Sequence, residues 1–137
     1  KAEDYQTVES LSGLNFAVEN GSAGQEAVLG IGIPEDQIIA VQDQAAALME
    51  VAAGTSDAAI IDSLMAGAMV GEGTGYPDLV YTVSLNKDEG EQYGVGFRKG
   101  SDLAQKLNDF FQSSYADGSM MQIAETYGVQ AAIIEQK

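Results

Sequence analysis

The sequence predicts an α/β fold, a three-layer sandwich in which a mostly parallel sheet carries helices on both faces. First, short β-branched or apolar runs alternate with helix-like segments through about the first 85 residues, the order typical of βαβ units with right-handed crossovers. Second, the run "AAII" at residues 58–61 is apolar throughout, as in a central strand buried on both faces. Third, 45% hydrophobic and 20% charged residues indicate a globular rather than a disordered chain.

Three strands are predicted in the first half of the chain. The run "LNFAVEN" at residues 14–20 places Phe16 and Val18 on one face of a strand. The run "QIIAVQ" at residues 37–42 is rich in β-branched side chains, which favour strands. The run "DAAIID" at residues 57–62 is an apolar strand closed by a carboxylate.

A helix is expected after each of these strands. Residues 22–31 form the first, because Ser22 and Gln25 have the S-x-x-Q spacing of a capping box. Asp43 is expected to cap the second, "QAAALMEVAAG", which Gly54 ends. The segment "SLMAGAMV" after the third strand predicts a short helix.

The rest of the chain predicts two more strands and then helices. The strands are expected in "DLVYTVSL" at residues 78–85 and "QYGVGFRKG" at residues 92–100. Ser101 is expected to cap a helix that Gly118 ends, and "SMMQIAETYG" forms another. The first of these helices carries an apolar stripe at helical spacing: Leu103, Leu107, Phe110, Phe111 and Tyr115.

Composition and charge exclude several classes of function. The chain has no Cys and no His, so a His-dependent catalytic triad and a Cys-based zinc site are excluded. A formal charge of −15 opposes binding to nucleic acid and to anionic membrane surfaces. We therefore expect no metal and no nucleic-acid partner. We also expect no cofactor and no enzymatic activity, but these two expectations follow from the family resemblance given below and not from composition.

The turn "GSAGQ" after the first strand is the first candidate site. A strand that passes through such a turn into a helix exposes the first amides of that helix, which favour an anion. The turn lacks the dinucleotide and P-loop motifs and has no basic side chain nearby, so a single carboxylate matches it better than a phosphate. Gly21, Ser22 and Ala23 are the candidate donors. The alternative is that Ser22 only caps the helix.

Asp62 is the second candidate, and it too has two interpretations. Asp is a preferred helix N-cap, and a carboxylate at the end of a buried strand also accepts a salt bridge from a ligand ammonium. In a parallel sheet, ligands bind beyond the carboxyl ends of the strands, and the turn and Asp62 both fall there. A site for one carboxylate and one ammonium fits an α-amino acid.

Three blocks of the sequence resemble a known family. The blocks are "LSGLNFAVENGSAGQEAV", "ALMEVAAGTSDAAIIDS" and "YGVGFRKGSDLAQKLNDFFQSSYADGSMMQIAETYG", between about residues 11 and 128. In this order they resemble the extracytoplasmic solute-binding proteins of amino-acid ABC transporters, the type II periplasmic binding proteins. The resemblance implies that the Gly21–Ala23 turn binds the α-carboxylate of an amino acid and Asp62 its α-ammonium. It also implies that Glu19 and Ile61 face the ligand side chain.

The resemblance also implies a division of the chain and a cellular place. Residues 1–92 correspond to the second, ligand-binding lobe, residues 93–128 to strands and helices that return to the first lobe, and residues 129–137 to a tail. The first lobe has no counterpart here, so the chain is expected to be a fragment. The family works outside the cytoplasm, in the periplasm or as cell-surface lipoproteins, with ABC permease subunits as partners.

Without a first lobe, the apolar stripe of the C-terminal helix needs another surface. We expect these helices to fold back on the lobe or to pair with another copy of the chain. Two other functions stay open on the same fold. One is a ligand-sensing domain of a signalling receptor, and the other is a dehydratase-like enzyme in which Asp62 serves as a base.

Overall fold

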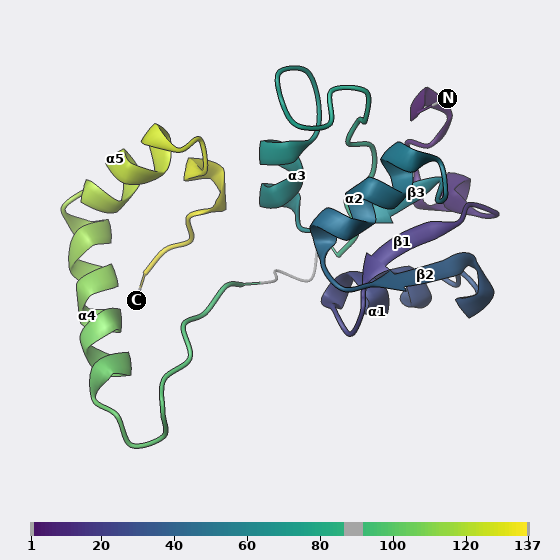
Figure 1. The fold of residues 1–137 in the computed structure, drawn as a ribbon. Coiled ribbons are helices and arrows are strands. Elements are labelled where there is room, and N and C mark those ends of the chain that lie inside the picture. The colour runs from purple at the N-terminus through teal and green to yellow at the C-terminus, as the bar shows by residue number, and fades with distance from the viewer. Residues whose placement is uncertain (1, 87–91, 137) are drawn as a thin grey trace. The chain divides into compact units, whose positions relative to one another are not determined.

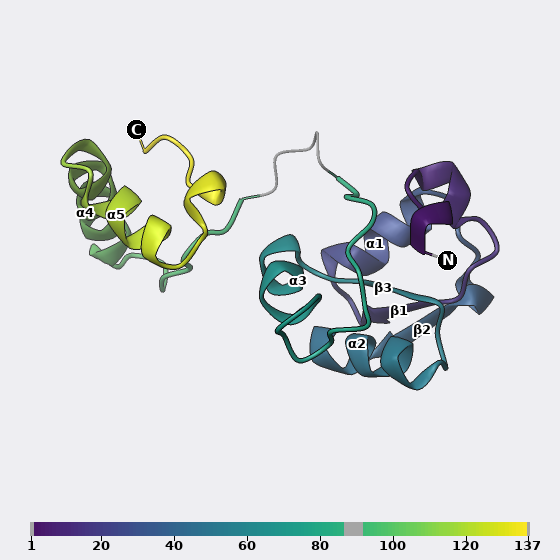
Figure 2. The same cartoon turned by 90° about the horizontal axis from the view of Figure 1, so that it is seen from above.

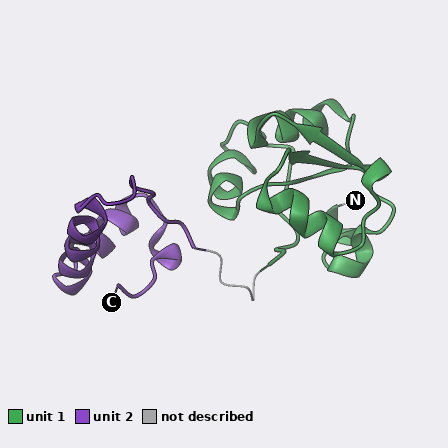
Figure 3. Cartoon of the chain, turned by 90° about the horizontal axis from the view of Figure 1, so that it is seen from below, with its two compact units in different colours: residues 1–91 green, residues 92–137 purple. Residues whose placement is uncertain are grey.

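The computed structural model describes residues 2–86 and 92–136. The chain divides into two compact units, residues 1–91 (unit 1) and residues 92–137 (unit 2) (Figure 3). Among the described residues, no helix has the length and apolar character needed to cross a bilayer. Each unit is described by itself below.

Unit 1 is built on a three-stranded parallel sheet (Figure 1). Its strands are β1 (Phe16–Glu19), β2 (Ile38–Val41) and β3 (Ala58–Ile60), in the order β2-β1-β3. Phe16 of β1 pairs with Ile38 of β2 on one side and with Ala58 of β3 on the other. The prediction of an α/β fold with a parallel sheet is confirmed.

Helices cover both faces of this sheet, which makes three layers. They are α1 (Ala23–Gly30), α2 (Gln44–Ala53) and α3 (Ser63–Met69). Viewed from above, α1 and α2 lie on opposite sides of the strands (Figure 2). This follows from the strand order, because right-handed crossovers that run first outward and then back place their helices on opposite faces. Short 3-10 helices lie in unit 1 at Ala2–Asp4, Val8–Leu11 and Glu35–Gln37, and in unit 2 at Gln130–Ala132.

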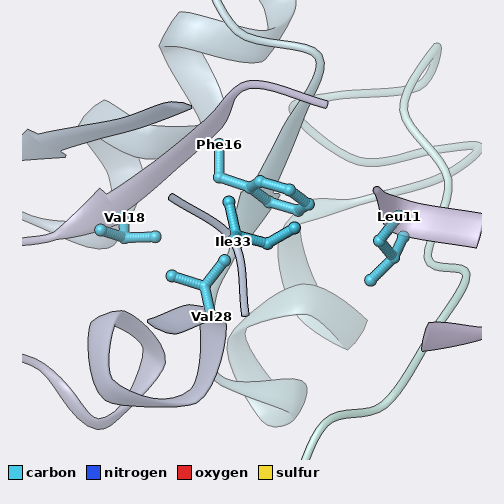
Figure 4. Packing of buried hydrophobic residues seen from close by; sticks show 5 residues of the cluster. All are labelled: Leu11, Phe16, Val18, Val28 and Ile33. Carbon is cyan, nitrogen blue, oxygen red and sulfur yellow. The ribbon is translucent and has the colours of Figure 1, made fainter. Parts of the chain in front are cut away.

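The core of unit 1 lies between β1 and α1. Phe16, Val18 and Val28 are fully buried, and Leu11 and Ile33 complete the cluster (Figure 4). Burying a side chain such as Phe16 stabilises the fold by roughly 1.5–3 kcal/mol. Alternate residues of a strand point to opposite faces, so Ala17 lies on the other face, where α2 buries Ala47 and Leu48. The core therefore fixes β1 at the centre of the unit.

The predicted caps of α2 are present. The Asp43 carboxylate accepts a hydrogen bond from the Ala46 amide at 2.8 Å. Gly54 ends the helix in the left-handed conformation, with φ of 76°, which glycine adopts without the steric cost of a Cβ. The local sequence therefore sets both ends of this helix.

Two predicted strands are not formed. Residues 78–85 and the described residues 92–100 carry no strand, although Val83 and Leu85 pack against the core cluster. An alternating pattern defines which face of a segment is apolar, but a strand also needs a neighbour for its backbone hydrogen bonds. Within the described residues, these two segments have the alternating apolar pattern but no neighbouring strand to which their backbone is hydrogen-bonded.

Unit 2 contains two helices, α4 (Leu103–Ala116) and α5 (Ser119–Thr126). The Ser101 hydroxyl accepts from the Leu103 amide at 3.2 Å, and Gly118 lies in the left-handed conformation after α4. Along the predicted stripe, Leu107, Phe111 and Tyr115 are half-buried, whereas Leu103 and Phe110 are 51% and 61% exposed. Among its described residues, unit 2 buries Ser114 and Ala124 and thus has no large apolar core.

Candidate functional site

The candidate residues meet at the carboxyl edge of the sheet. Val18 of β1 pairs with Ile60 of β3. The next residues along the chain, Glu19 at the end of β1 and Ile61 just after β3, therefore lie at the same level of the sheet. The turn at residues 20–22 continues from β1 and Asp62 continues from β3. The parallel register therefore brings all six candidate residues to one edge: Glu19, Gly21, Ser22, Ala23, Ile61 and Asp62.

Ser22 is the N-cap of α1. Its hydroxyl accepts from the Gln25 amide at 3.2 Å and donates to the Glu19 carbonyl at 2.7 Å. The Gln25 side chain reaches back to the Gly21 amide at 2.7 Å, one residue earlier than in the expected capping box. Gly21 has φ of 71°, a conformation that favours glycine. The cap interpretation of Ser22 is thus correct, and the turn is fixed by three side-chain hydrogen bonds.

Two backbone amides in the first turn of α1 have no hydrogen-bond acceptor among the described residues. The Gly21, Ser22 and Gln25 amides donate within the turn. The amides of Ala23 and Gly24 donate to no acceptor in residues 2–86 and 92–136. The first N–H groups of a helix carry the positive end of its dipole and bind anions. The amides available to a ligand carboxylate are therefore those of Ala23 and Gly24.

Asp62 is the N-cap of α3. Its Oδ1 accepts from the Leu64 amide at 2.9 Å and from the Met65 amide at 3.0 Å. Its own amide donates to the Gln44 side chain at 2.8 Å. The capping interpretation is confirmed, and the side chain is half-buried. A carboxylate offers about four acceptor positions, so capping by one oxygen is compatible with a second role for the same group.

Gly24 brings the two halves of the edge together. A Cβ at this position would lie 3.1 Å from the Ile60 side chain and 3.4 Å from the Ile60 carbonyl. The first turn of α1 therefore packs directly on the end of β3, two residues before Asp62. A larger residue would push the helix start away from the strand. The absence of a side chain at Gly24 is what permits this close approach.

The electrostatic environment of the edge favours a cation. Between Lys1 and Lys87 the sequence has no Lys or Arg, and Glu19, Asp43 and Asp62 all lie where strands end. The summed field of such a unit attracts positive groups and repels negative ones. An anion is therefore accepted only locally, at helix amides, and a multiply charged anion is disfavoured.

Sequence reasoning missed one residue that positions the site. Gln44 holds the Asp62 amide from the first turn of α2. Gln25 was expected to cap α1, but its side chain holds the Gly21 amide in place of the Ser22 amide. Gln44 follows the predicted cap Asp43, which also lies at the carboxyl edge of the sheet, just after β2. The pairing of Gln44 with Asp62 depends on the strand order and has no local signal.

Two hollows of unit 1 are not lined by any of the six candidate residues, although Gln25, which holds the Gly21 amide, lines one of them. A hollow of about 190 Å3 is lined by Gln25, Leu29, Glu35 and Ile38. Another, of about 480 Å3, is lined by residues of two segments, 6–8 and 81–84. Within the residues that the structure describes, no group of acidic side chains is arranged to hold a metal ion.

Comparisons with protein-family models, with curated proteins and with solved structures each give no match. The description of the edge therefore rests on the geometry above.

Proposed function

We propose that the chain is the ligand-binding lobe of an extracytoplasmic solute-binding protein that delivers an amino acid to the permease subunits of an ABC transporter. It binds a zwitterionic amino acid without covalent chemistry. The amides of Ala23 and Gly24 receive the ligand carboxylate, and Asp62 receives its ammonium. Of the three donors expected from the sequence, Gly21 and Ser22 are replaced by Gly24, because their own amides already donate within the turn. Glu19 and Ile61, at the same level of the edge, face the ligand side chain.

The observation that carries this proposal is the close approach of Gly24 to Ile60. Two amides without a partner among the described residues thus lie next to the end of β3, two residues before Asp62. Opposite ligand charges thus find matching groups within one short edge, and the acidic surroundings strengthen the ammonium contact. The resemblance of the sequence to this family of binding proteins supports the same assignment.

The binding is expected to be weak. By the resemblance, the first lobe of the family supplies the remaining contacts and closes over the ligand, which favours the closed state by differential binding. One lobe makes about half of these contacts, so we expect dissociation constants of about 1 mM. The ligand is expected to be recovered unchanged, whereas its conversion would favour the dehydratase-like alternative.

The test is an amide NMR titration of the full chain with alanine and with its two halves, propionate and ethylamine. Alanine should shift the amides of residues 21–25 and 61–65, and each half alone should bind at least tenfold more weakly. A panel of polar amino acids then defines the side-chain preference. Equal shifts from propionate and alanine would contradict an ammonium site.

A matched pair of variants separates binding from capping. Asp62→Asn and Asp43→Asn each remove the charge of a helix N-cap that follows a strand. Because Asn caps a helix about as well as Asp, both are expected to cost less than about 0.5 kcal/mol of stability, but only Asp62→Asn should abolish the alanine shifts. If Asp43→Asn abolished them equally, the ammonium contact would not be at Asp62.

A further inference from the structure

Asn20 is the one asparagine of this sequence that precedes a glycine. The chain has four asparagines, and the residues that follow them are Phe16, Gly21, Lys87 and Asp109. In an Asn-Gly pair no β-carbon shields the glycine nitrogen, so this nitrogen can attack the side-chain amide of the residue before it. The sequence therefore singles out Asn20 as the asparagine most open to deamidation, the loss of its side-chain nitrogen as ammonia.

The structure leaves the Asn20 side chain available for this reaction. Asn20 is exposed directly after β1, and its side chain has no hydrogen-bond partner among the described residues. Asn15, by contrast, is held by the Asp57 carboxylate, which accepts from its side-chain amide at 3.1 Å. The Asn20 carboxamide can therefore rotate toward the peptide that follows it.

The nitrogen that attacks is held by Gln25. The Gly21 amide donates to the Gln25 side-chain oxygen at 2.7 Å. This nitrogen must lose its proton and turn toward Asn20, so the hydrogen bond to Gln25 has to open first, as in amide hydrogen exchange. Once it has opened, no packing opposes the movement, because even a Cβ at Gly21 would meet nothing within 4 Å. One net hydrogen bond slows such a step roughly fivefold.

We propose that Asn20 is a site of spontaneous deamidation and that Gln25 sets the rate by holding the Gly21 amide. The Gly21 nitrogen gives its proton to hydroxide and forms a bond to Cγ of Asn20. The bond from Cγ to Nδ2 breaks, and Nδ2 leaves as ammonia after taking a proton from water. One water molecule then opens the cyclic imide and leaves aspartate or isoaspartate at position 20, with no change of oxidation state.

The product changes the turn before α1 in two ways. It adds one negative charge to a chain whose formal charge is −15. The isoaspartate form also lengthens the backbone between residues 20 and 21 by a methylene group, which displaces Gly21 from Gln25 and loosens the start of α1. The reaction needs only this chain and water, so the inference goes beyond the proposed binding function and does not depend on it.

The first test incubates the full chain in mildly alkaline buffer and follows the more acidic product by ion-exchange chromatography, with peptide mass spectrometry to locate the change. Asn20 should react before the other three asparagines. Asn20→Gln should remove this first product, because the larger ring that glutamine forms closes far more slowly. The proposal is overturned if Asn20 stays intact in the folded chain after the same site has reacted completely in guanidinium-unfolded chain.

A matched pair of variants tests the role of Gln25. Gln25 and Gln44 each lie in the first turn of a helix and hold a backbone amide with their side-chain oxygen, that of Gly21 at 2.7 Å and that of Asp62 at 2.8 Å. Gln25→Leu should speed the deamidation of Asn20 roughly fivefold, whereas Gln44→Leu should leave its rate unchanged. Equal acceleration by both variants would trace the rate to a general loosening of unit 1. That result, or an unchanged rate in Gln25→Leu, would contradict the proposal.

Discussion

Units 1 and 2 differ in how far their apolar side chains are buried. Unit 1 buries Phe16, Val18 and Val28 between a parallel sheet and a helix, and it carries nearly all of the net charge. Unit 2 has helices with equally regular apolar spacing, but Leu103 and Phe110 remain exposed. The comparison shows that an amphipathic pattern specifies a helix, whereas a stable unit also needs a partner surface for that pattern.

The largest effect is expected from truncating one phenylalanine in each unit. Phe16→Ala removes a fully buried ring and should cost about 3–5 kcal/mol, a large part of the stability of a domain this size. Phe110→Ala removes a ring that is 61% exposed and should change the stability of unit 2 by less than about 0.5 kcal/mol. Urea unfolding followed by NMR signals of each unit measures both. Similar costs would break the distinction between the units.

Glycine substitutions sharpen the comparison at an intermediate scale. Gly30→Ala at the end of α1 meets no atom within 4 Å and should stabilise unit 1 by roughly 0.5–1 kcal/mol. Gly24→Ala in the same helix meets Ile60 and should be less favourable than Gly30→Ala by about 1 kcal/mol. Thermal unfolding of the two variants measures the difference. Equal gains would contradict the close approach of α1 to β3.

Tight packing around glycine is confined to unit 1. A Cβ added at any of the glycines of unit 2, from Gly94 to Gly128, meets nothing within 4 Å in the described structure. Substitutions there act through the backbone alone, most clearly at Gly118 with its φ of 81°. This contrast provides the internal reference for the measurement at Gly24.

The smallest effect concerns the pH dependence of α5. Hydrogen bonds from the Ser119 hydroxyl and amide hold the pKa of Asp117 below its ordinary value, and the amide bond measures 2.9 Å. Because the folded-state pKa is lowered, this contribution is fully present above the unfolded-state value of about 3.8 and is lost as the pH falls through the folded-state pKa. The Ser119 amide shift should follow this titration.

Asp117→Asn provides the control for that titration, because an amide side chain does not ionise in this range. The Ser119 amide shift should then be flat between pH 2 and 5. An unchanged titration in the variant would assign the effect to another carboxylate. Ionisation of Asp117 would then make no contribution to the start of α5.

The elements that local signals define were predicted from the sequence. β1 and β2 lie within residues 14–20 and 37–42, and α1 and α2 begin after their predicted caps, Ser22 and Asp43. Each of these signals involves residues within one turn or one strand. The strands predicted at residues 78–85 and 92–100 failed because a ladder requires a neighbour that the pattern itself does not name.

The candidate edge was predictable in outline and not in detail. The ends of β1 and β3 and the caps Ser22 and Asp62 follow from the sequence. The contacts of Gln44 with the Asp62 amide and of Gly24 with Ile60 do not, because they join segments that only the strand order brings together. The roles of Glu19, Ile61 and Asp62 toward a ligand remain predictions that the titrations test.

The central position of β1 has a consequence for synthesis on the ribosome. Within this sheet, β1 is synthesised before both of its neighbours, and β3 begins only at Ala58. A nascent chain halted before residue 58 presents β1 with one open hydrogen-bonding edge, the edge that later pairs with β3. Such an edge is a target for chaperones and for pairing with other chains. The vulnerable interval in the life of this protein therefore closes when the third strand is released.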